Sequence, residues 1–253
     1  MISNSLITTI LSKPVKLDSY LLNVSSRTAT HKFLGGATQG CYIRMVKLLA
    51  SIYTQQGLDL STVRVLDWGV GKGHISYLMK VAGFDVKSCD VVSSDDDSSF
   101  GQDTPILREK SINVIPLNDP WLLPFKDGEF DMVVSFGVLE HVPNDYESLR
   151  ELRRIIKPGG IFFFSFLPYW LSWSQRLAHL RGNRYHPRLY KVRRLARMAS
   201  DASFEVDHIW HGQLFPKNSF PHSNHLERVD RFLTRVTPLK YFATNIEGIL
   251  VAK

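Results

Sequence analysis

The stretch VLDWGVGKGH at residues 65–74 decides the fold of this chain. An apolar run ends there in the carboxylate of Asp67, three glycines alternate with other residues, and apolar residues at helical spacing follow from Ile75 onward. That order predicts a strand, a tight turn and the start of a helix. Glycine suits such a turn because the backbone must bend sharply and let a ligand approach with no Cβ atom in the way. The helix start behind the turn offers unpaired N–H groups to an anionic or polar ligand.

The spacing of the glycines separates two kinds of nucleotide-binding turn. A dinucleotide fingerprint, Gly-x-Gly-x-x-Gly, would place its third glycine at residue 74, where this chain has His74. The pattern present is Asp67-x-Gly69-x-Gly71-x-Gly73. It resembles motif I of the class I S-adenosylmethionine (SAM) methyltransferases. The resemblance implies that the turn approaches the methionine end of SAM and that the acid and the turn form a polar pocket for its ammonium group. A glycine-rich turn without a ligand is the alternative.

Length and composition fit one large α/β domain. The chain has 253 residues, 44% of them apolar and 22% charged, which is ordinary for a soluble globular protein. Cys41 and Cys89 have neither metal-ligand spacing nor a disulfide framework, and we expect Cys89 to be buried and reduced. The longest apolar run, 161–171, is too short for a bilayer, and the first residues do not resemble a signal peptide. We therefore expect a cytoplasmic enzyme.

The net charge of +7 is concentrated in one segment. Eight of the 31 basic residues lie between positions 171 and 200, and no acidic residue does. The basic surface at 176–197 has three interpretations: it attracts phosphate, it brings Trp170 and Trp173 to an anionic membrane surface as a peripheral contact, or it is the solvated face of a core helix.

A second acid follows the next predicted strand, 84–92. Asp90 stands 21 residues after Gly69, at the position where an acid usually accepts hydrogen bonds from ribose hydroxyls. The loop after it contains three adjacent acids, Asp95 to Asp97. Because adjacent acids on a loop are more often solvated surface than metal ligands, we expect no metal there.

The middle of the chain carries further motifs in a fixed order. A strand at 112–117 delivers Asn118-Asp119-Pro120-Trp121, a second strand covers 130–136, and Gly-Val-Leu-Glu-His-Val-Pro follows at 137–143. A Lys-Pro-Gly-Gly turn at 157–160 then leads into an apolar strand at 161–166. The order closely resembles the ubiquinone/menaquinone-type (methyltransferase type 11) group. The resemblance implies that Asp119 faces the adenine amine with Trp121 nearby. The alternative is that Asp119 caps a turn and Trp121 belongs to the core.

These elements predict an α/β fold, a doubly wound, seven-stranded, mostly parallel sheet of the Rossmann-like methyltransferase type. The last strand, within 239–252, would form an antiparallel C-terminal hairpin. We expect a helical N-terminal cap at 1–60 and a SAM-dependent methyltransferase domain at 61–253. Within that domain we expect a lid or substrate segment at about 168–190 and a helical insertion at about 216–238. The segment 26–36 either folds over the cofactor or is a plain surface loop.

Ligands of such sheets bind outside the carboxyl ends of the strands, where the predicted cofactor residues gather. The predicted SAM-binding residues are Asp67, Trp68, Gly69, Gly71, Gly73, Asp90, Val91, Asn118, Asp119, Pro120, Trp121, Ser135 and Phe136.

His141 is the candidate catalytic base, because its motif follows the fourth strand and imidazole titrates near neutrality. The alternative is that it only hydrogen-bonds a neighbouring loop. His179 and His186 are weaker candidates, and we expect surface positions for the histidines at 208, 211, 222 and 225.

The leading hypothesis is a SAM-dependent methyltransferase acting on a small or lipid-linked acceptor at oxygen. Methyl transfer from a sulfonium mainly needs alignment of donor and acceptor, and an oxygen acceptor also needs a base. An RNA or protein methyltransferase using the basic surface is one alternative. Residues 135–138 read Ser-Phe-Gly-Val and lack the Asn/Asp-Pro-Pro-aromatic tetrad of enzymes that methylate base amines, so nucleic acid is disfavoured. An inactive scaffold of the same fold is the other alternative.

Overall fold

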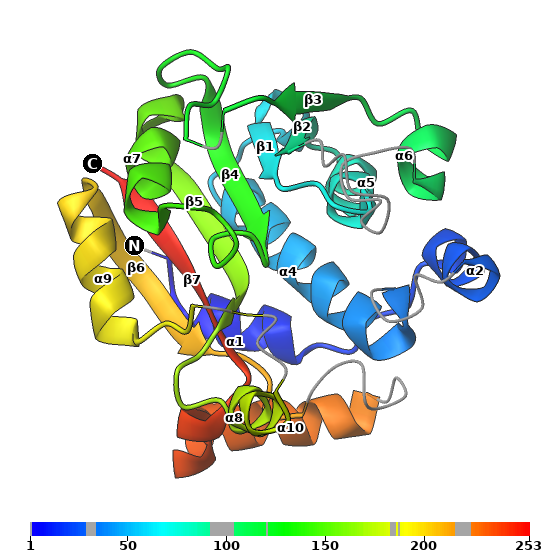
Figure 1. The fold of residues 1–253 in the computed structure, drawn as a ribbon. Coiled ribbons are helices and arrows are strands. Elements are labelled where there is room, and N and C mark those ends of the chain that lie inside the picture. Colours follow the sequence, from blue (N-terminus) through cyan, green and yellow to red (C-terminus); the bar gives the residue numbers. More distant parts are fainter. Residues whose placement is uncertain are drawn as a thin grey trace.

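One mixed sheet forms the centre of the molecule. The computed structural model describes residues 2–28, 34–91, 104–119, 121–182, 186, 188–215 and 224–253, and these contain a seven-stranded sheet in the order β3-β2-β1-β4-β5-β7-β6 (Figure 1). The strands are β1 (Arg64–Trp68), β2 (Asp85–Val91), β3 (Val114–Leu117), β4 (Phe130–Phe136), β5 (Ile156–Pro168), β6 (Phe204–His211) and β7 (Asn245–Ala252). All neighbouring pairs from β3 to β5 are parallel, and β7 runs antiparallel to both β5 and β6. The predicted doubly wound sheet with an antiparallel C-terminal hairpin is confirmed.

Helices cover both faces of this sheet. They are α1 (Asn4–Ser12), α2 (Ser19–Arg27), α4 (Gly36–Thr54), α5 (His74–Ala82), α6 (Pro105–Glu109), α7 (Asp145–Ile155), α8 (Trp173–Leu180), α9 (Val192–Asp201) and α10 (Asn224–Val236), with short 3-10 helices η1 (Leu60–Thr62) and η3 (Pro238–Phe242). One core cluster joins α1, α2, α4 and α5 to one face of the sheet, through residues such as Val65 and Val134. The other joins α7 and α9 to the opposite face, through residues such as Leu66 and Phe162. Consecutive strand residues are therefore buried on opposite faces, as in a parallel sheet covered on both sides.

The N-terminal helices are part of the main core. Apolar residues at helical spacing on α4, including Ile43 and Leu49, are buried against α5 and the sheet. Tyr42, Met45 and Leu48 are buried as well, so most of the surface of α4 is covered, while Lys47 is exposed. The division of the chain at residue 60 stays a prediction.

Two boundaries differ from the sequence-based expectation. Residues 157–160 do not precede β5 as a turn but form an irregularity within it, because Phe130 pairs with Ile156 and Met132 pairs with Ile161. The segment expected as one strand from residue 239 begins with η3, and β7 starts only at Asn245. Pro238 explains the second difference, since its fixed φ and missing N–H favour the first turn of a helix.

The basic segment at 176–197 includes most of α9. On α9, Leu195 and Ala199 are buried while Arg193, Arg194 and Arg197 are exposed, which confirms the solvated-face interpretation for this helix. Trp170 is half-buried, and the Lys191 Nζ lies 4.4 Å from its ring centroid. Among the described helices, none has the length and apolar composition needed to cross a bilayer.

The glycine turn gives a prediction about folding stability. Gly69 has φ +78°, and a Cβ built there would lie 2.3 Å from Val138 Cγ2, whereas Gly57 has φ +75° and nothing within 4 Å. Gly57→Ala should therefore cost about 1–2 kcal/mol of unfolding free energy, the usual penalty of left-handed backbone for a residue with a Cβ. Gly69→Ala should cost a further ~1–3 kcal/mol through overpacking. Urea denaturation measures both losses.

A double variant isolates the packing contribution. Val138→Ala should remove most of the extra cost of Gly69→Ala, because residues in contact are not additive. Equal destabilisation by Gly57→Ala and Gly69→Ala would contradict this account of the turn.

Candidate functional site

The candidate site lies where the sheet changes direction of winding. The strand β1 has β2 on one side and β4 on the other, and Trp68 is in register with Cys89 and with Ser135. The polar residues Asp67, Asp90 and Ser135 therefore stand at the same edge, at the carboxyl ends of three neighbouring strands. This is the position at which open α/β sheets bind their ligands.

The turn after β1 is held to the end of β2. Its three glycines have φ values of +78°, +51° and +85°, a backbone region that favours glycine. The N–H groups of Gly69 and Val70 donate to the Cys89 carbonyl oxygen at 2.9 and 3.1 Å. The turn is therefore fixed relative to β2 without any ligand.

Two of the glycines make room for the protein's own side chains. A Cβ at Gly69 would meet Val138, and a Cβ at Gly73 would lie 2.6 Å from Leu107 Cδ2. The sequence argument attributed these glycines to the approach of a ligand. The structure shows that close packing against the loop after β4 and against α6 already requires them.

Asp90 points into the turn, as its proposed role requires. Its Oδ2 accepts the Gly71 N–H at 2.8 Å and its Oδ1 accepts the Val91 N–H at 2.8 Å. The side chain is only 9% exposed, and burial raises its pKa while the two hydrogen bonds oppose that shift. A carboxylate has about four lone-pair positions, so two donors leave it able to accept ribose hydroxyls. The side chain of Val91 is exposed.

Asp67 lies deeper than the turn. It is 1% exposed, and the Ser76 hydroxyl donates to its Oδ2 at 2.5 Å. The hydroxyls of Ser76 and Ser88 are 2.7 Å apart, which extends this polar group to β2. Burial raises the pKa of Asp67 to about 7, with the negative charge of Asp90 acting in the same direction and the Ser76 hydrogen bond against it. The neighbouring Trp68 side chain belongs to the core on the opposite face of the sheet.

The residues after β3 form an exposed turn. Asp119 Oδ1 accepts the N–H groups of Trp121 and Leu122 at 2.7 and 3.0 Å, and these bonds lower its pKa. Asp119 thus caps a turn, as the alternative interpretation held, but Trp121 is 43% exposed and is not core. Asn118 is exposed too. Pro120 lies outside the described residues, and the contact of this turn with adenine stays a prediction.

An aromatic group stands at the ends of β4 and β5. Phe136 packs against Tyr42 and Phe166 with ring centroids 5.9 and 6.0 Å apart, while Ser135 beside it is buried. Tyr42 also contacts the His74 ring at 4.5 Å, so α4 reaches from the glycine turn to β5. Phe166 has φ +62°, an uncommon conformation that is enriched at functional sites. Sequence reasoning missed Tyr42 and Phe166, because neither lies in a motif.

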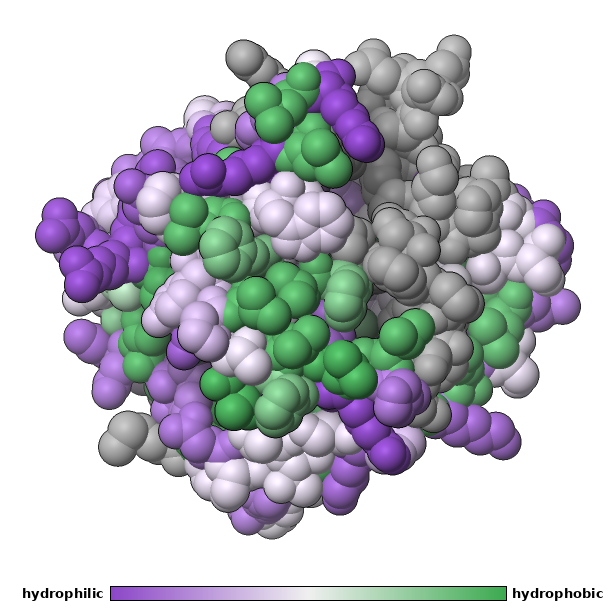
Figure 2. Space-filling view, turned by 90° about the horizontal axis from the view of Figure 1, so that it is seen from below, coloured by the Kyte–Doolittle hydropathy of each residue, from purple (hydrophilic) through white to green (hydrophobic). Residues whose placement is uncertain are grey.

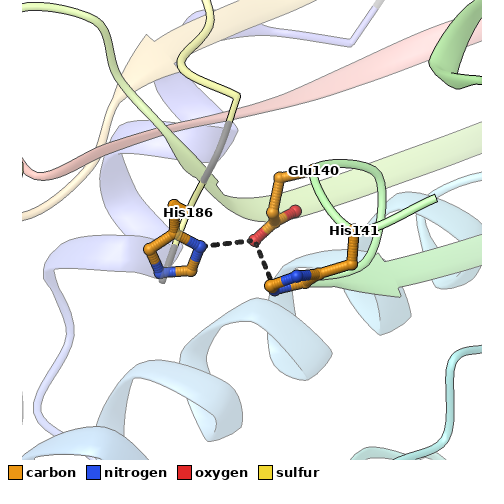
Figure 3. A group of neighbouring side chains, drawn as sticks. All are labelled: Glu140, His141 and His186. Atoms are coloured by element: carbon orange, nitrogen blue, oxygen red, sulfur yellow. Dashed lines mark ion pairs between the residues drawn. The ribbon is translucent and has the colours of Figure 1, made fainter. Parts of the chain in front are cut away.

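His141 lies beside a buried acid. Its Nε2 is 3.9 Å from Glu140 Oε1, and His186 Nδ1 approaches the same oxygen at 3.8 Å (Figure 3). The Glu140 side chain is 1% exposed. Burial lowers the pKa of His141, and burial followed by the charges of His141 and His179 lowers the pKa of His186 to about 4. Both rings are therefore neutral at pH 7, and the contacts with Glu140 become ion pairs only on protonation.

The loop containing His141 is anchored by the segment that precedes α9. The Tyr190 hydroxyl donates to the Leu139 carbonyl at 3.1 Å, and the Arg188 guanidinium donates to the carbonyls of Val142 and Pro143. These bonds explain why His186, far along the chain, reaches Glu140. Glu140 stands directly before His141 in the sequence. This adjacency was the signal from which a contact between the two side chains could have been predicted.

The same three side chains are the group in the described chain that could hold a metal ion. One oxygen of Glu140 and one nitrogen each of His141 and His186 lie within 4.8 Å of one another. The adjacent acids at 95–97 lie outside the described residues.

The remaining histidines differ in their surroundings. His208 Nδ1 is 2.7 Å from Asp207 Oδ2, and His225 is exposed as expected. His211 was expected at the surface, but it packs between Tyr169 and Tyr241, with ring centroids 4.8 and 5.7 Å away. Burial lowers its pKa to about 4, so the expectation for His211 was wrong. The histidine at 222 lies outside the described residues.

The chain is similar in sequence to known proteins. A family model described as "Methyltransferase domain" matches residues 38–209. A protein named "Ubiquinone biosynthesis O-methyltransferase" from Dechloromonas aromatica is 28% identical over 168 residues, which is 62% of this chain and 71% of the relative. One with the same name from Rickettsia bellii is 33% identical over 107 residues, or 42% of this chain and 43% of the relative. This chain thus spans less than half of the Rickettsia protein.

Solved structures share the fold. A SAM-dependent methyltransferase from Archaeoglobus fulgidus aligns with a TM-score of 0.54 at 19% identity, over 93% of this chain and 100% of that chain. One from Thermotoga maritima aligns with a TM-score of 0.55 at 15% identity, over 92% and 99%. Because the family model matches more than half of the chain and the sheet order agrees, the chain belongs to the methyltransferase-domain family and has the class I fold of SAM-dependent methyltransferases.

Proposed function

We propose that the enzyme methylates an oxygen of a small-molecule or lipid-linked acceptor. The observation that carries this proposal is the His141 imidazole beside the buried Glu140 carboxylate, in the loop that follows β4, where burial lowers the pKa of the ring. A hydroxyl acceptor must lose a proton as the new bond forms, whereas a neutral amine can react without a base. The curated relatives are named as O-methyltransferases of ubiquinone biosynthesis, which supports both oxygen and a lipid-linked acceptor.

The proposed cofactor site fits SAM in its chemistry. Asp90 has acceptor capacity left for ribose hydroxyls, and the buried carboxylates of Asp67 and Asp90 favour a cationic ligand. SAM, when bound, supplies an electrophilic methyl group on a sulfonium. The residues of this chain then have three tasks: to hold the nucleoside, to exclude water and to position the acceptor.

His141 would take the proton of the acceptor hydroxyl. Its Nε2 faces Glu140, so the imidazolium formed would be stabilised by a carboxylate already in place. The aromatic group of Tyr42, Phe136 and Phe166 would provide the apolar wall against which acceptor and methyl group meet.

Cofactor binding gives the first test. Titration calorimetry should show SAM binding to the wild type and binding at least tenfold weaker for Asp90→Ala, because a charged hydrogen-bond acceptor contributes about 1.5–3 kcal/mol. Asp85→Ala is the matched control, since Asp85 is exposed at the opposite end of the same strand. Undiminished SAM binding by Asp90→Ala would refute the assigned role of this acid.

The second test concerns the proposed role of His141 as the base. With a hydroxyl acceptor found by screening labelled SAM against cell extracts, His141→Gln should lower kcat by roughly 10²–10⁴-fold. Wild-type activity should fall as the pH decreases through the lowered pKa of His141, since protonation removes the base. This acidic limb should be absent from the variant.

The control for this test is His225→Gln, an exposed residue on α10 that should leave the profile unchanged. EDTA should also leave wild-type activity unchanged. Loss of activity in EDTA that a divalent metal restores would show that Glu140, His141 and His186 hold a metal, against the proposed base.

An exposed apolar face supports peripheral contact with an anionic membrane. Figure 2 shows apolar side chains gathered on the face formed by α8, α10 and η3. The exposed members include Trp173, Leu177, Leu180, Leu226, Val229, Phe232, Val236, Leu239, Tyr241 and Phe242. Leu180 is 85% exposed, the exposed Arg176 and Arg228 lie on the same two helices, and the exposed Arg181 directly follows α8. Apolar side chains beside arginines are typical of a surface that rests on anionic headgroups.

Vesicle sedimentation tests this contact. The protein should sediment with phosphatidylcholine vesicles that contain phosphatidylglycerol and much less with phosphatidylcholine alone. Phe232→Ser combined with Val236→Ser should reduce binding, while Val81→Ser, which changes an exposed apolar residue on α5, should not. Binding that is independent of anionic lipid, or equal for the two variants, would contradict the proposed contact.

A further inference from the structure

A buried cluster of charges joins α4 to α10. Arg44 of α4 forms an ion pair with Glu227 of α10, and their side chains are only 3% and 11% exposed. Arg231 Nη1 approaches the same carboxylate at 3.7 Å. Arg235 follows one turn later on α10 and interacts electrostatically with Glu247 of β7. We call Arg44, Arg231 and Arg235 the arginine cluster.

The cluster has more donors than the described residues satisfy. The buried atoms Arg44 Nη1, Arg231 Nε and Arg235 Nη1 have no hydrogen-bond acceptor within the described parts of the chain. Buried polar atoms in folded proteins are nearly always paired, so three unpaired guanidinium donors in one place call for an acceptor. Burial and the charge of Arg44 lower the pKa of Arg231 to about 10, which also indicates a shortage of negative charge.

The neighbouring acids are already engaged by other donors. Glu247 accepts the Trp210 indole N–H at 2.8 Å and the Ser165 hydroxyl at 3.3 Å. Asp230 accepts the N–H groups of Leu214 and Phe215 at 2.9 and 2.8 Å. Glu227 is shared between Arg44 and Arg231. Among the described residues, two glutamates therefore face three arginines, and Asp230, which accepts the main-chain N–H groups after β6, also interacts electrostatically with Arg231.

The arginine cluster lies close to the aromatic group, where we propose that the acceptor binds. Arg44 is two residues from Tyr42, which contacts Phe136 and Phe166 at the carboxyl ends of β4 and β5. Ser165 of β5 contacts both Met45 of α4 and Glu247, so the same strand end borders the aromatic group and the cluster. Figure 1 shows α10 below the ends of β5 and β6, on the side toward which the parallel strands point.

We propose that the arginine cluster binds an anionic group, a carboxylate or a phosphate, carried by the methyl acceptor. The planar guanidinium groups suit both anions, because each offers parallel N–H donors to two oxygens. The reactive hydroxyl would lie toward Phe136 and His141 while the anionic group is held by α4 and α10. This inference rests on the proposed function and adds the chemical class of its acceptor.

Matched probe molecules test the proposal. Benzoate and phenyl phosphate carry the two anions, and benzamide and phenol are their neutral counterparts. Ligand-observed NMR on the full chain, with and without SAM, should show binding of at least one anionic probe and at least tenfold weaker binding of its neutral partner. Preference for benzoate would identify a carboxylate and preference for phenyl phosphate a phosphate ester. Equal binding of charged and neutral probes, or no binding of any probe, would overturn the proposal.

Substitutions in the arginine cluster test whether the anionic probe binds there. Arg44→Met combined with Glu227→Gln removes both members of the buried pair, so the carboxylate is not left without Arg44, and Arg231 is the neighbour that loses the shared carboxylate. This double variant and Arg235→Met should each weaken the anionic probe at least tenfold. Arg228→Met, which changes an exposed arginine on the same helix, should not. Undiminished probe binding by the double variant would overturn the assignment.

SAM binding on the same samples separates the two proposals. If the wild type binds SAM normally but shows no preference for an anionic probe, the acidic acceptor is wrong and the SAM site stands. If the wild type binds the anionic probe but no SAM, the proposed methyl transfer fails instead. A variant that loses SAM binding and its circular dichroism spectrum is misfolded, and Arg235→Met then decides the assignment.

Discussion

The hydrogen bond from the Gly71 N–H to the Asp90 carboxylate, 2.8 Å long, is the constraint on which the candidate site depends. It joins the turn after β1 to the end of β2, and the bonds from Gly69 and Val70 to the Cys89 carbonyl reinforce the same junction. Left-handed glycines allow the turn to present its N–H groups to β2. The acid is thereby aimed at the place where a nucleoside would lie before any ligand binds.

This junction places two buried carboxylates near each other. Burial raises the pKa of both Asp67 and Asp90, and each charge is partly compensated by donors from Ser76 or from the turn. A buried negative pair of this kind is costly unless something positive approaches it. SAM carries a sulfonium and an ammonium group. The charge of these two acids therefore suits the cofactor that we propose for this turn.

The proposed acceptor side is formed differently from the proposed cofactor side. Its walls come from α4, from the ends of β4 and β5 and from α10, which are far apart in the sequence. Aromatic rings such as Tyr42 and Phe136 form one part, and the arginine cluster forms another. The cofactor side is thus compact and local, whereas the acceptor side depends on how distant helices pack over the sheet.

The sequence by itself determined the sheet, the glycine turn and the acid after β2, because strand-turn-helix signals and motif spacing are local. It also identified His141, but not the buried Glu140 that contacts it or the reason His186 arrives there. Only the tertiary structure decided that Val138 and Leu107 pack on the glycines and that Arg44 meets α10. These contacts join residues distant in sequence, and a one-dimensional pattern carries no signal for them.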